Sequence, residues 1–276
     1  TLSWPFGTRA STTRSPQYKA NIGDRKGTAL KIAAAQIHLY PKVAQNLENI
    51  TAWTKKAKAQ GVDLVCFPET SLTGYLFEGF NQLDAQEVNG AIDQLEGLAK
   101  ELGINLLVGT PCWVGDRFYN SVVALLADGR RLFYHKTHLV SFEKEYFSAG
   151  SDLLTFELGA LTVGTIICRD QNFPELASRI RNAGARVLFI SCAHYYPPMV
   201  ARLKVDKNRA LPIARACENG FFVCKANAVG SYRGEINLGH SIIVGPNGVV
   251  IAEAGETQEE LLTFDIDEKR LDWRWG

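Results

Sequence analysis

The strongest constraint on the fold of this sequence is its alternation, from residue 30 onward, between short apolar runs and longer amphipathic segments. Short apolar runs are typical of buried strands, and apolar residues three or four positions apart are typical of helices. Because each element must bury its apolar face against another, the alternation predicts a layered α/β protein. The predicted strands cover residues 30–37, 62–67, 104–109, 121–127, 132–135, 161–168, 187–191, 221–226, 239–244 and 248–254, and the predicted helices cover residues 43–60, 91–102, 174–182 and 202–219.

Proline, glycine and aspartate mark the ends of several of these elements. Pro174 opens the third predicted helix, and Gly184 follows its end. Asp128-Gly129 separates two apolar runs in the way that a hairpin turn does. Strands outnumber helices and include this hairpin, so mixed sheets are favoured over an all-parallel sheet.

The chain divides into a short N-terminal extension, residues 1–27, and one domain, residues 28–276. Residues 1–27 are rich in Ser, Thr, Arg and Gly and have little periodicity. A processed leader is one interpretation, because basic, hydroxylated segments with few acids also form organellar transit peptides; an expression remnant or an ordinary extension is the other. Residues 30–270 contain no linker or internal repeat, which predicts a single domain.

Composition excludes several classes of partner. The formal net charge is +1, from 30 Lys and Arg against 29 Asp and Glu, so no basic surplus points to nucleic acid. No apolar run approaches the ~20 residues that span a bilayer. We therefore expect a soluble protein that binds neither nucleic acid nor membranes.

The cysteine pattern predicts reduced thiols. None of the six cysteines forms a CxxC pair or joins a histidine at a spacing typical of zinc ligands. Several lie in apolar runs, where a free cysteine behaves as a small buried hydrophobe. We expect no metal site and a cytoplasmic location.

One cysteine, Cys168, stands where a nucleophile would stand. It ends an apolar run, and polar residues follow it before the helix that opens with Pro174. A thiol at such a turn lies near unpaired backbone N–H groups, which lower its pKa and can bind an oxyanion. A structural cysteine at a strand end is the alternative interpretation. Cys192 also ends a predicted strand, but it lacks the polar turn and the proline-started helix.

Two charged residues, Glu69 and Lys136, follow predicted strands as well. A partly buried Glu69 could act as a general base, although a loop or capping carboxylate is an equally simple interpretation. Lys136 could stabilise a thiolate and an oxyanion, although lysines at strand ends are usually solvated cations. Their local sequence does not decide between these alternatives.

Glu69, Lys136 and Cys168 together, in this order and each at a strand end, resemble the catalytic residues of the nitrilase superfamily of carbon-nitrogen hydrolases. The resemblance extends over roughly residues 30–268. It is carried by residues 67–69 (FPE), 136–139 (KTHL), 168–175 (CRDQNFPE), 208–210, 215–221, 239–241 and 246–248.

The resemblance implies a four-layer α-β-β-α sandwich with mixed sheets that forms a homodimer or a larger homo-oligomer through its helices. It implies Glu69 as the general base, Cys168 as the nucleophile and Lys136 as the oxyanion-binding cation, with no metal or organic cofactor. The second glutamate of the family corresponds to Glu143. Glu145 lies two residues away, and only the spacing to the following residues favours Glu143.

The predicted substrate pocket contains Arg169, His194, Tyr195 and Tyr75. Arg169 replaces the aromatic residue that the family often has after the nucleophile, so it could bind an acidic substrate or pair with Asp170. The resemblance favours a small amide or N-carbamoyl compound as the substrate. A nitrilase, an acyl-transferring member and a non-catalytic metabolite-binding member are the alternatives.

Overall fold

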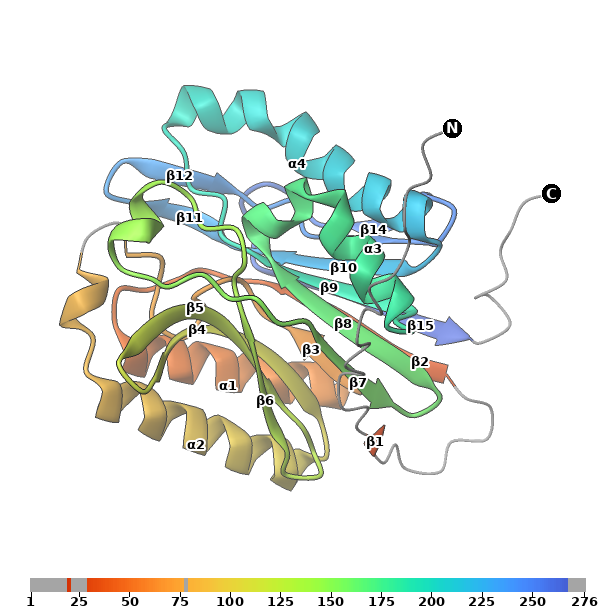
Figure 1. Cartoon of the computed structure of the whole chain (residues 1–276), viewed down its shortest axis with the longest axis horizontal. Coiled ribbons are helices and arrows are strands. Elements are labelled where there is room, and N and C mark those ends of the chain that lie inside the picture. The colour runs from red at the N-terminus through yellow and green to blue at the C-terminus, as the bar shows by residue number, and fades with distance from the viewer. Residues whose placement is uncertain (1–18, 21–28, 77–78, 268–276) are drawn as a thin grey trace, which may run out of the picture.

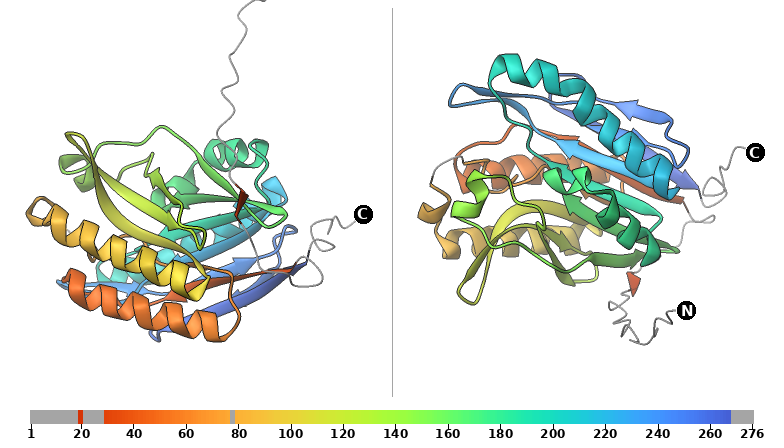
Figure 2. Two further views of the ribbon diagram at one scale, coloured as in Figure 1. Left: turned by 90° about the horizontal axis from the view of Figure 1, so that it is seen from below. Right: turned by 45° about the horizontal axis from the view of Figure 1, so that its top comes forward.

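Two β-sheets lie face to face, with two helices on the outer face of each (Figure 1). The computed structural model describes residues 19–20, 29–76 and 79–267. Figure 2 shows the first two helices on one side of the molecule and the last two on the other. The predicted four-layer α-β-β-α sandwich is confirmed. The helices are α1 (Val43–Ala59), α2 (Ala85–Leu102), α3 (Pro174–Asn182) and α4 (Pro198–Asn219).

The six-stranded sheet runs in the order β15-β2-β3-β4-β5-β6. Its centre, β2-β3-β4, is parallel, and the other neighbours are antiparallel. The carboxyl ends of the parallel strands therefore share one edge, which is where sites form in such sheets. The strands are β2 (Ala29–Gln36), β3 (Leu64–Cys66), β4 (Asn105–Val114), β5 (Arg117–Leu125), β6 (Arg131–His135) and β15 (Glu260–Asp267).

The seven-stranded sheet runs in the order β1-β7-β8-β9-β10-β13-β14. Its parallel centre is β8-β9-β10, with antiparallel neighbours on both sides, and the short β1 adds in parallel to β7. The predicted mixed sheets are thus confirmed. The strands are β1 (Lys19–Ala20), β7 (Leu154–Leu158), β8 (Leu161–Ile167), β9 (Val187–Cys192), β10 (Phe222–Asn227), β13 (Ile242–Val244) and β14 (Val250–Glu253).

Smaller elements connect or flank these layers. A hairpin of β11 (Val229–Tyr232) and β12 (Glu235–Leu238) follows β10. Three 3₁₀ turns interrupt the loops, namely η1 (Phe80–Gln82), η2 (Phe142–Glu145) and η3 (Cys168–Asn172).

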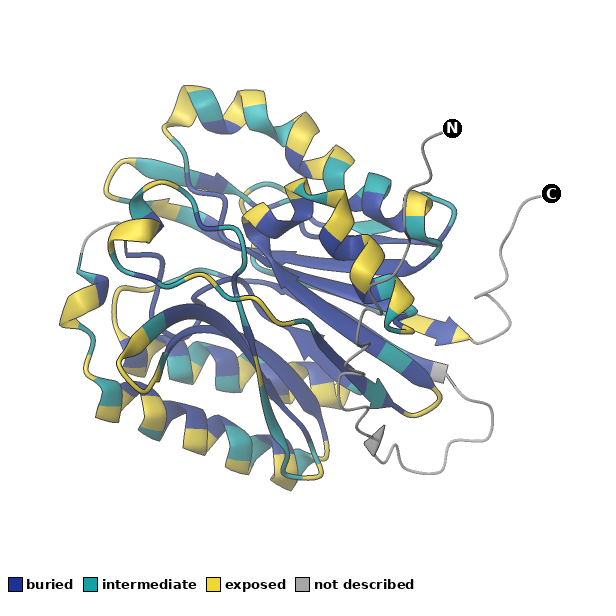
Figure 3. Ribbon diagram, in the orientation of Figure 1, coloured by how far each residue is buried: buried dark blue, intermediate teal, exposed yellow. Residues whose placement is uncertain are grey.

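The core explains why several strands are apolar on both faces. In β2, Ile32 and Ala34 pack against the opposite sheet, while Ala33 and Ala35 pack under α1 and α2. Figure 3 shows the consequence: the central strands of the two sheets are buried, edge strands such as β14 and β15 are partly exposed, and the helices alternate between buried and exposed faces. Doubly covered strands of this kind appear in a sequence as continuous apolar runs rather than as alternating ones.

Element boundaries follow the sequence prediction closely in some places and not in others. Helix α3 spans the predicted residues 174–182, and α4 continues through Pro212. Helix α2 begins at Ala85 rather than at residue 91, because the Asp84 side chain caps it by accepting a hydrogen bond from Gln86 N at 2.9 Å. The strands β7, β11, β12 and β15 were not predicted.

Most of the predicted N-terminal extension lies outside the described residues, apart from β1, which pairs with β7. Among the helices that the structure describes, none is both long and apolar enough to cross a membrane.

Candidate active site

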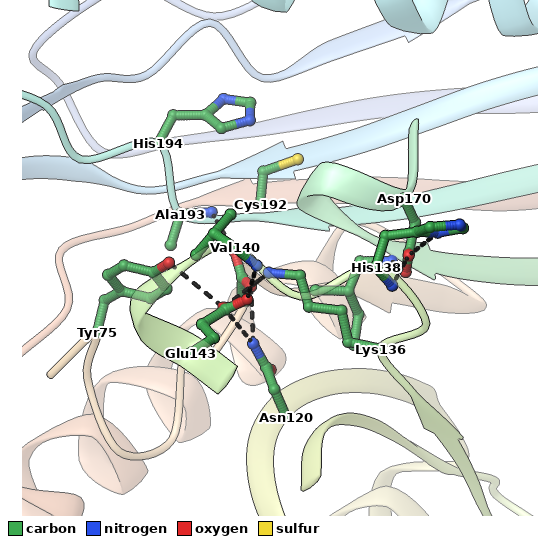
Figure 4. A network of polar contacts seen from close by, with 12 residues as sticks. Tyr75, Asn120, Lys136, His138, Val140, Glu143, Asp170, Cys192, Ala193 and His194 are labelled. Atoms are coloured by element: carbon green, nitrogen blue, oxygen red, sulfur yellow. Dashed lines mark hydrogen bonds and ion pairs between the residues drawn. The ribbon is translucent and has the colours of Figure 1, made fainter. Parts of the chain in front are cut away.

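Three ionisable side chains meet at the carboxyl edge of the six-stranded sheet (Figure 4). Glu69 follows β3, Lys136 follows β6, and Glu143 lies in η2. The Lys136 Nζ atom lies 2.6 Å from Glu69 Oε1 and 2.7 Å from Glu143 Oε1, and all three side chains are fully buried. One ammonium therefore bridges two carboxylates away from water.

Further hydrogen bonds occupy the remaining carboxylate oxygens. Asn120 Nδ2, from β5, donates to Glu69 Oε1 at 2.8 Å and to Glu143 Oε1 at 3.0 Å. The backbone N–H of Ala193 donates to Glu69 Oε2 at 3.1 Å, and that of Val140 donates to Glu143 Oε2 at 2.8 Å. Every oxygen of the two carboxylates thus accepts at least one hydrogen bond, which fixes both side chains in place.

Two glycines allow the loops that carry Glu69 and Lys136 to lie this close to the sheet. A Cβ atom on Gly109 would lie 2.5 Å from Thr70 N and 2.7 Å from Glu69 Cα. A Cβ atom on Gly150 would lie 2.8 Å from the His135 carbonyl carbon, and Gly150 N donates to Lys136 O at 2.9 Å. A larger side chain at Gly109 would therefore displace the loop that carries Glu69, and one at Gly150 would displace the loop that carries Lys136.

Burial and charge shift the pKa values of this cluster. Burial raises the pKa of Glu69 from its ordinary value of 4.5 to about 7, against the lowering effect of Lys136 and with a further raising effect from Glu143. Burial alone would lower the pKa of Lys136, but the neighbouring carboxylates raise it above its ordinary value. Lys136 therefore stays charged, while Glu69 can gain and lose a proton near neutral pH.

Cys168 lies at the carboxyl end of β8, in the facing sheet, and begins η3. Its φ angle is 44°, a left-handed conformation that a side-chain-bearing residue adopts only at an energetic cost. The hydrogen bond with Cys192 and burial raise the pKa of the Cys168 thiol; Glu69 raises it further and Lys136 lowers it. The thiol therefore interacts electrostatically with the acid and the lysine of the opposite sheet.

Asp170 ties the Cys168 turn to the loop that carries Lys136. Its carboxylate accepts hydrogen bonds from Ile167 N at 3.1 Å, from Tyr134 OH at 2.7 Å and from His138 N at 2.8 Å. Because Ile167 ends β8 and His138 belongs to the lysine loop, one buried carboxylate connects the two sheets beside the site.

Comparisons with known proteins identify the family of this chain. A sequence model of the carbon-nitrogen hydrolase family matches residues 31–274. The chain belongs to the carbon-nitrogen hydrolase family. Its relatives include a protein named nitrilase from Pyrococcus abyssi, 32% identical, with 86% of this chain and 90% of the relative covered.

Two further carbon-nitrogen hydrolases have more specific names. A 2-oxoglutaramate amidase from Bacillus subtilis is 32% identical, with 83% of this chain and 86% of the relative covered. An N-carbamoylputrescine amidase from Solanum lycopersicum is 30% identical, with 90% of this chain and 91% of the relative covered.

A solved structure of an amidase from Nesterenkonia sp. superposes with a TM-score of 0.79 at 26% identity, covering 91% of this chain and 95% of that one. The fold of the nitrilase superfamily, which the sequence resemblance implied, is therefore confirmed.

The structure separates two glutamates that local sequence could not separate. Glu143 is buried and contacts Lys136, whereas Glu145 is exposed on the same short turn. The geometry supports Glu143 as the second carboxylate of this carbon-nitrogen hydrolase.

The predicted substrate-binding residues occupy different surroundings. Tyr75 donates to Glu143 Oε1 at 3.4 Å and stacks on Tyr195 with the ring centroids 6.0 Å apart. His194 is buried and lines a small hollow with Tyr196 and several asparagines. Arg169 is exposed, and among the described residues no ion pair joins it to Asp170, whose carboxylate is held by other groups.

Sequence reasoning missed Asn120 and Gln171. Both are buried; Asn120 bridges the two glutamates, and Gln171 Nε2 lies 3.7 Å from Cys192 Sγ. The available signal was an amide in an apolar strand, because a buried polar side chain needs partners. For Gln171 the signal was its position in the polar turn after Cys168.

Proposed function

We propose that the chain hydrolyses small amides or N-carbamoyl compounds through a thioester on Cys168. The observation that carries the proposal is the buried Lys136 held between two carboxylates, opposite a thiol at a strained turn. A fold alone would not require these groups at one sheet edge, since buried charges are destabilising unless they are paired.

In the proposed reaction, Glu69 removes the proton from Cys168 Sγ and the thiolate attacks the carbonyl carbon of the substrate. Lys136 and the backbone N–H of Arg169 stabilise the resulting oxyanion. Glu69 then returns its proton to the leaving nitrogen, so ammonia or an amine departs and a thioester remains. A water molecule that Glu69 deprotonates hydrolyses the thioester and regenerates the thiol.

The pKa of Glu69 supports its role in both proton transfers. A group with a pKa of about 7 is present in both protonation states at neutral pH, so it can accept a proton and return it. Glu143 does not need to transfer a proton in this scheme; it accepts a hydrogen bond from Lys136 and is itself held by Asn120.

Solved relatives support a cysteine mechanism and an amide substrate. In one structure of the Nesterenkonia amidase, the acetamide moiety of fluoroacetamide is covalently added at the active-site cysteine. Another structure of that amidase contains butyramide. In the present chain, asparagine side chains line the small hollow beside His194 and offer amide groups to a polar substrate.

The experiment that decides the reaction is a panel of primary amides, N-carbamoyl amines, N-carbamoyl amino acids and nitriles, with ammonia release and product identity as readouts. We expect turnover of an amide or a carbamoyl compound. Turnover confined to nitriles, or none with any class, would refute the proposal.

A matched pair of cysteine variants tests the nucleophile. Cys168→Ala should abolish turnover, and mass spectrometry should detect an acyl adduct on the parent enzyme but not on this variant. Cys217→Ala, at an exposed thiol, should retain the parent rate. An acyl adduct on a cysteine other than Cys168 would overturn the assignment.

We also propose that the protein forms a homodimer or a larger homo-oligomer in which α4 takes part. Met199 and Leu203, one helical turn apart on α4, are 80% and 78% exposed, which leaves an apolar stripe without cover in the single chain. Leu203→Lys should therefore shift sedimentation toward the monomer, whereas a parent protein that sediments as a monomer would contradict the proposal.

A further inference from the structure

Two cysteines and a histidine form a compact cluster in the seven-stranded sheet, next to the acid-lysine cluster. Cys168, Cys192 and His194 are all buried, and their ligand atoms lie within 4.8 Å of one another. Figure 4 shows Cys192 and His194 side by side next to the acid-lysine cluster. The proposed hydrolysis uses only Cys168 of these three as a reacting group.

The sheet itself brings the two thiols together. Ile167, the last residue of β8, pairs with Ser191 of the parallel strand β9. Cys168 directly follows Ile167 and Cys192 directly follows Ser191, so the register places the two thiols beside each other. His194 follows two residues later, and its backbone N–H is held by Asn227 Oδ1 at 3.1 Å. The cluster therefore rests on backbone register rather than on flexible side chains, which is the condition for a preorganised ligand set.

The Nε2 atom of His194 lies on the side of the thiols. It is 3.4 Å from Gln171 Nε2, which in turn is 3.7 Å from Cys192 Sγ. A neutral imidazole nitrogen of this kind is the most common protein ligand of metal ions.

We propose that Cys168, Cys192 and His194 bind one thiophilic cation such as Zn²⁺, and that this cation reversibly blocks the nucleophile. In a tetrahedral zinc site, bond lengths of about 2.3 Å to sulfur and about 2.0 Å to nitrogen place the ligand atoms roughly 3.5–3.8 Å apart. Small side-chain movements within the 4.8 Å spread reach that geometry. Two sulfurs and one imidazole select soft cations over Mg²⁺ and Ca²⁺.

Binding replaces two S–H bonds by two metal–thiolate bonds, and the two protons pass to solvent. With Cys168 Sγ bonded to the cation, no free thiolate remains to attack a carbonyl carbon. The inhibitory part of this inference rests on the proposed hydrolysis, whereas cation binding does not.

The test uses the metal-free, reduced full chain. Co²⁺ titration should give a thiolate-to-metal absorbance band at one equivalent, and Zn²⁺ should displace the Co²⁺. Cys192→Ser should lose part of the band and weaken Zn²⁺ binding at least about 100-fold, beyond the usual effect of altering an outer partner of a metal ligand. Cys217→Ala is the matched control and should bind as the parent does.

Inhibition is measured separately, as the ratio of amide hydrolysis with and without Zn²⁺ for each variant. One equivalent of Zn²⁺ should abolish amide hydrolysis by the parent, and a chelator should restore the rate. Cys192→Ser should need at least about 100-fold more Zn²⁺ for the same inhibition. His194→Gln is a second variant in case Cys192→Ser fails to fold, which a thermal melt detects. A parent without the thiolate band, or a Cys192→Ser band equal to that of the parent, would overturn the cation site.

Failure of the hydrolysis proposal is distinguishable, because Co²⁺ binding is read without any substrate. If metal-free protein hydrolyses no amide while Co²⁺ still binds through the two thiols, the cation site stands and the proposed function falls. If the parent hydrolyses amides and Zn²⁺ bound at the site leaves the rate unchanged, the inhibitory part of the inference falls.

Discussion

The two sheets bring different chemistry to the same edge of the molecule. The six-stranded sheet supplies Lys136 and two glutamates, Glu69 and Glu143. Every carboxylate oxygen of the two glutamates accepts a hydrogen bond. The seven-stranded sheet supplies thiols, an amide and an imidazole, and within the described part of the chain Gln171 Oε1 and His194 Nδ1 have no hydrogen-bond partner. On the six-stranded side the same holds for the uncharged Asn120 Oδ1. The charged side chains of the six-stranded sheet are therefore fixed before a substrate binds. The polar side chains of the seven-stranded sheet can still form hydrogen bonds or metal bonds with a ligand.

Two buried lysines make the same contrast. Lys136 lies between two carboxylates, whereas the contact of Lys225, in β10, within the described residues is a hydrogen bond to the backbone carbonyl of Asn208 at 2.9 Å. Burial lowers the pKa of Lys225, while the carboxylates raise that of Lys136. Depth of burial is equal for the two, so the partner groups account for the difference.

Replacing each lysine by methionine should give the largest difference in stability and rate between the two sheets. Lys136→Met leaves two buried carboxylates uncompensated, so we expect a loss of about 3–5 kcal/mol in the free energy of unfolding. The rate should also fall by at least about 10³-fold through loss of the oxyanion-binding cation. Lys225→Met should stay within about 1 kcal/mol of the parent, because an apolar group of similar volume replaces a poorly paired charge. Urea unfolding and steady-state kinetics measure both; equal destabilisation by the two changes would contradict the contrast.

A glycine substitution tests how rigidly the six-stranded sheet positions Glu69. The Cβ atom of Gly109→Ala would overlap the backbone around Glu69, so we expect a loss of about 1–3 kcal/mol in stability, together with reduced kcat. Gly97→Ala, in the exposed face of α2 with no atom near its added methyl, should instead gain about 0.5–1 kcal/mol. Thermal melts and amide kinetics report both. Parent-like kcat in Gly109→Ala would show that the Glu69 loop is more adaptable than its contacts indicate.

The pH profile tests the coupling between the two glutamates. The base Glu69 must be deprotonated, so kcat/KM should rise with pH through an acid limb near its pKa of about 7. Glu143→Gln removes a negative neighbour that raises this pKa, so the limb should move to lower pH. A limb that stays in place, or moves upward, would rule out Glu69 as the titrating group.

The same pKa shift has a consequence for stability. The folded chain holds the Glu69 proton more tightly than the unfolded chain does, because its pKa is raised from 4.5 to about 7. The contribution of Glu69 to stability is therefore greatest below about pH 4.5 and decreases as the pH rises to about 7.

The smallest effect is expected at the contact between Tyr75 and Glu143. Tyr75→Phe removes a donor at 3.4 Å, a long hydrogen bond, so kcat/KM should fall by about fivefold, corresponding to roughly 1 kcal/mol. The stacking with Tyr195 remains, so KM should change less than kcat. A fall in kcat/KM as large as that expected for Lys136→Met would mean that Tyr75 also contacts the substrate.

The parts of the fold that could be predicted from sequence are those bounded by proline or glycine and those made of continuous apolar runs. Pro174 and Gly184 bracket α3, whose predicted residues match the observed helix. The strand β15 was missed because it lies at a sheet edge, where its residues are mostly half-exposed and leave no continuous apolar run. The start of α2 was missed because its first turn is polar and its cap is a single aspartate side chain.

The site divides in a similar way. Glu69 and Lys136 could be named in advance because charged residues at strand ends match a family pattern, and Glu143 because of its spacing within that pattern. The structure brings the three side chains into contact. The role of Asn120 could not be named in advance, because an amide in an apolar strand predicts only that it has partners, and the two glutamates that it contacts belong to distant segments. Contacts between distant segments depend on register, which the sequence of one segment does not contain.

The left-handed backbone at Cys168 has a bearing on how relatives of this chain could diverge. Glycine, and to a lesser extent asparagine, would adopt a φ angle of 44° with less steric conflict than cysteine does. A lineage released from hydrolysis would therefore be expected to drift toward one of these residues at this position. A cysteine kept at this φ angle is then what a reaction that needs the thiol, such as the proposed hydrolysis, would select for.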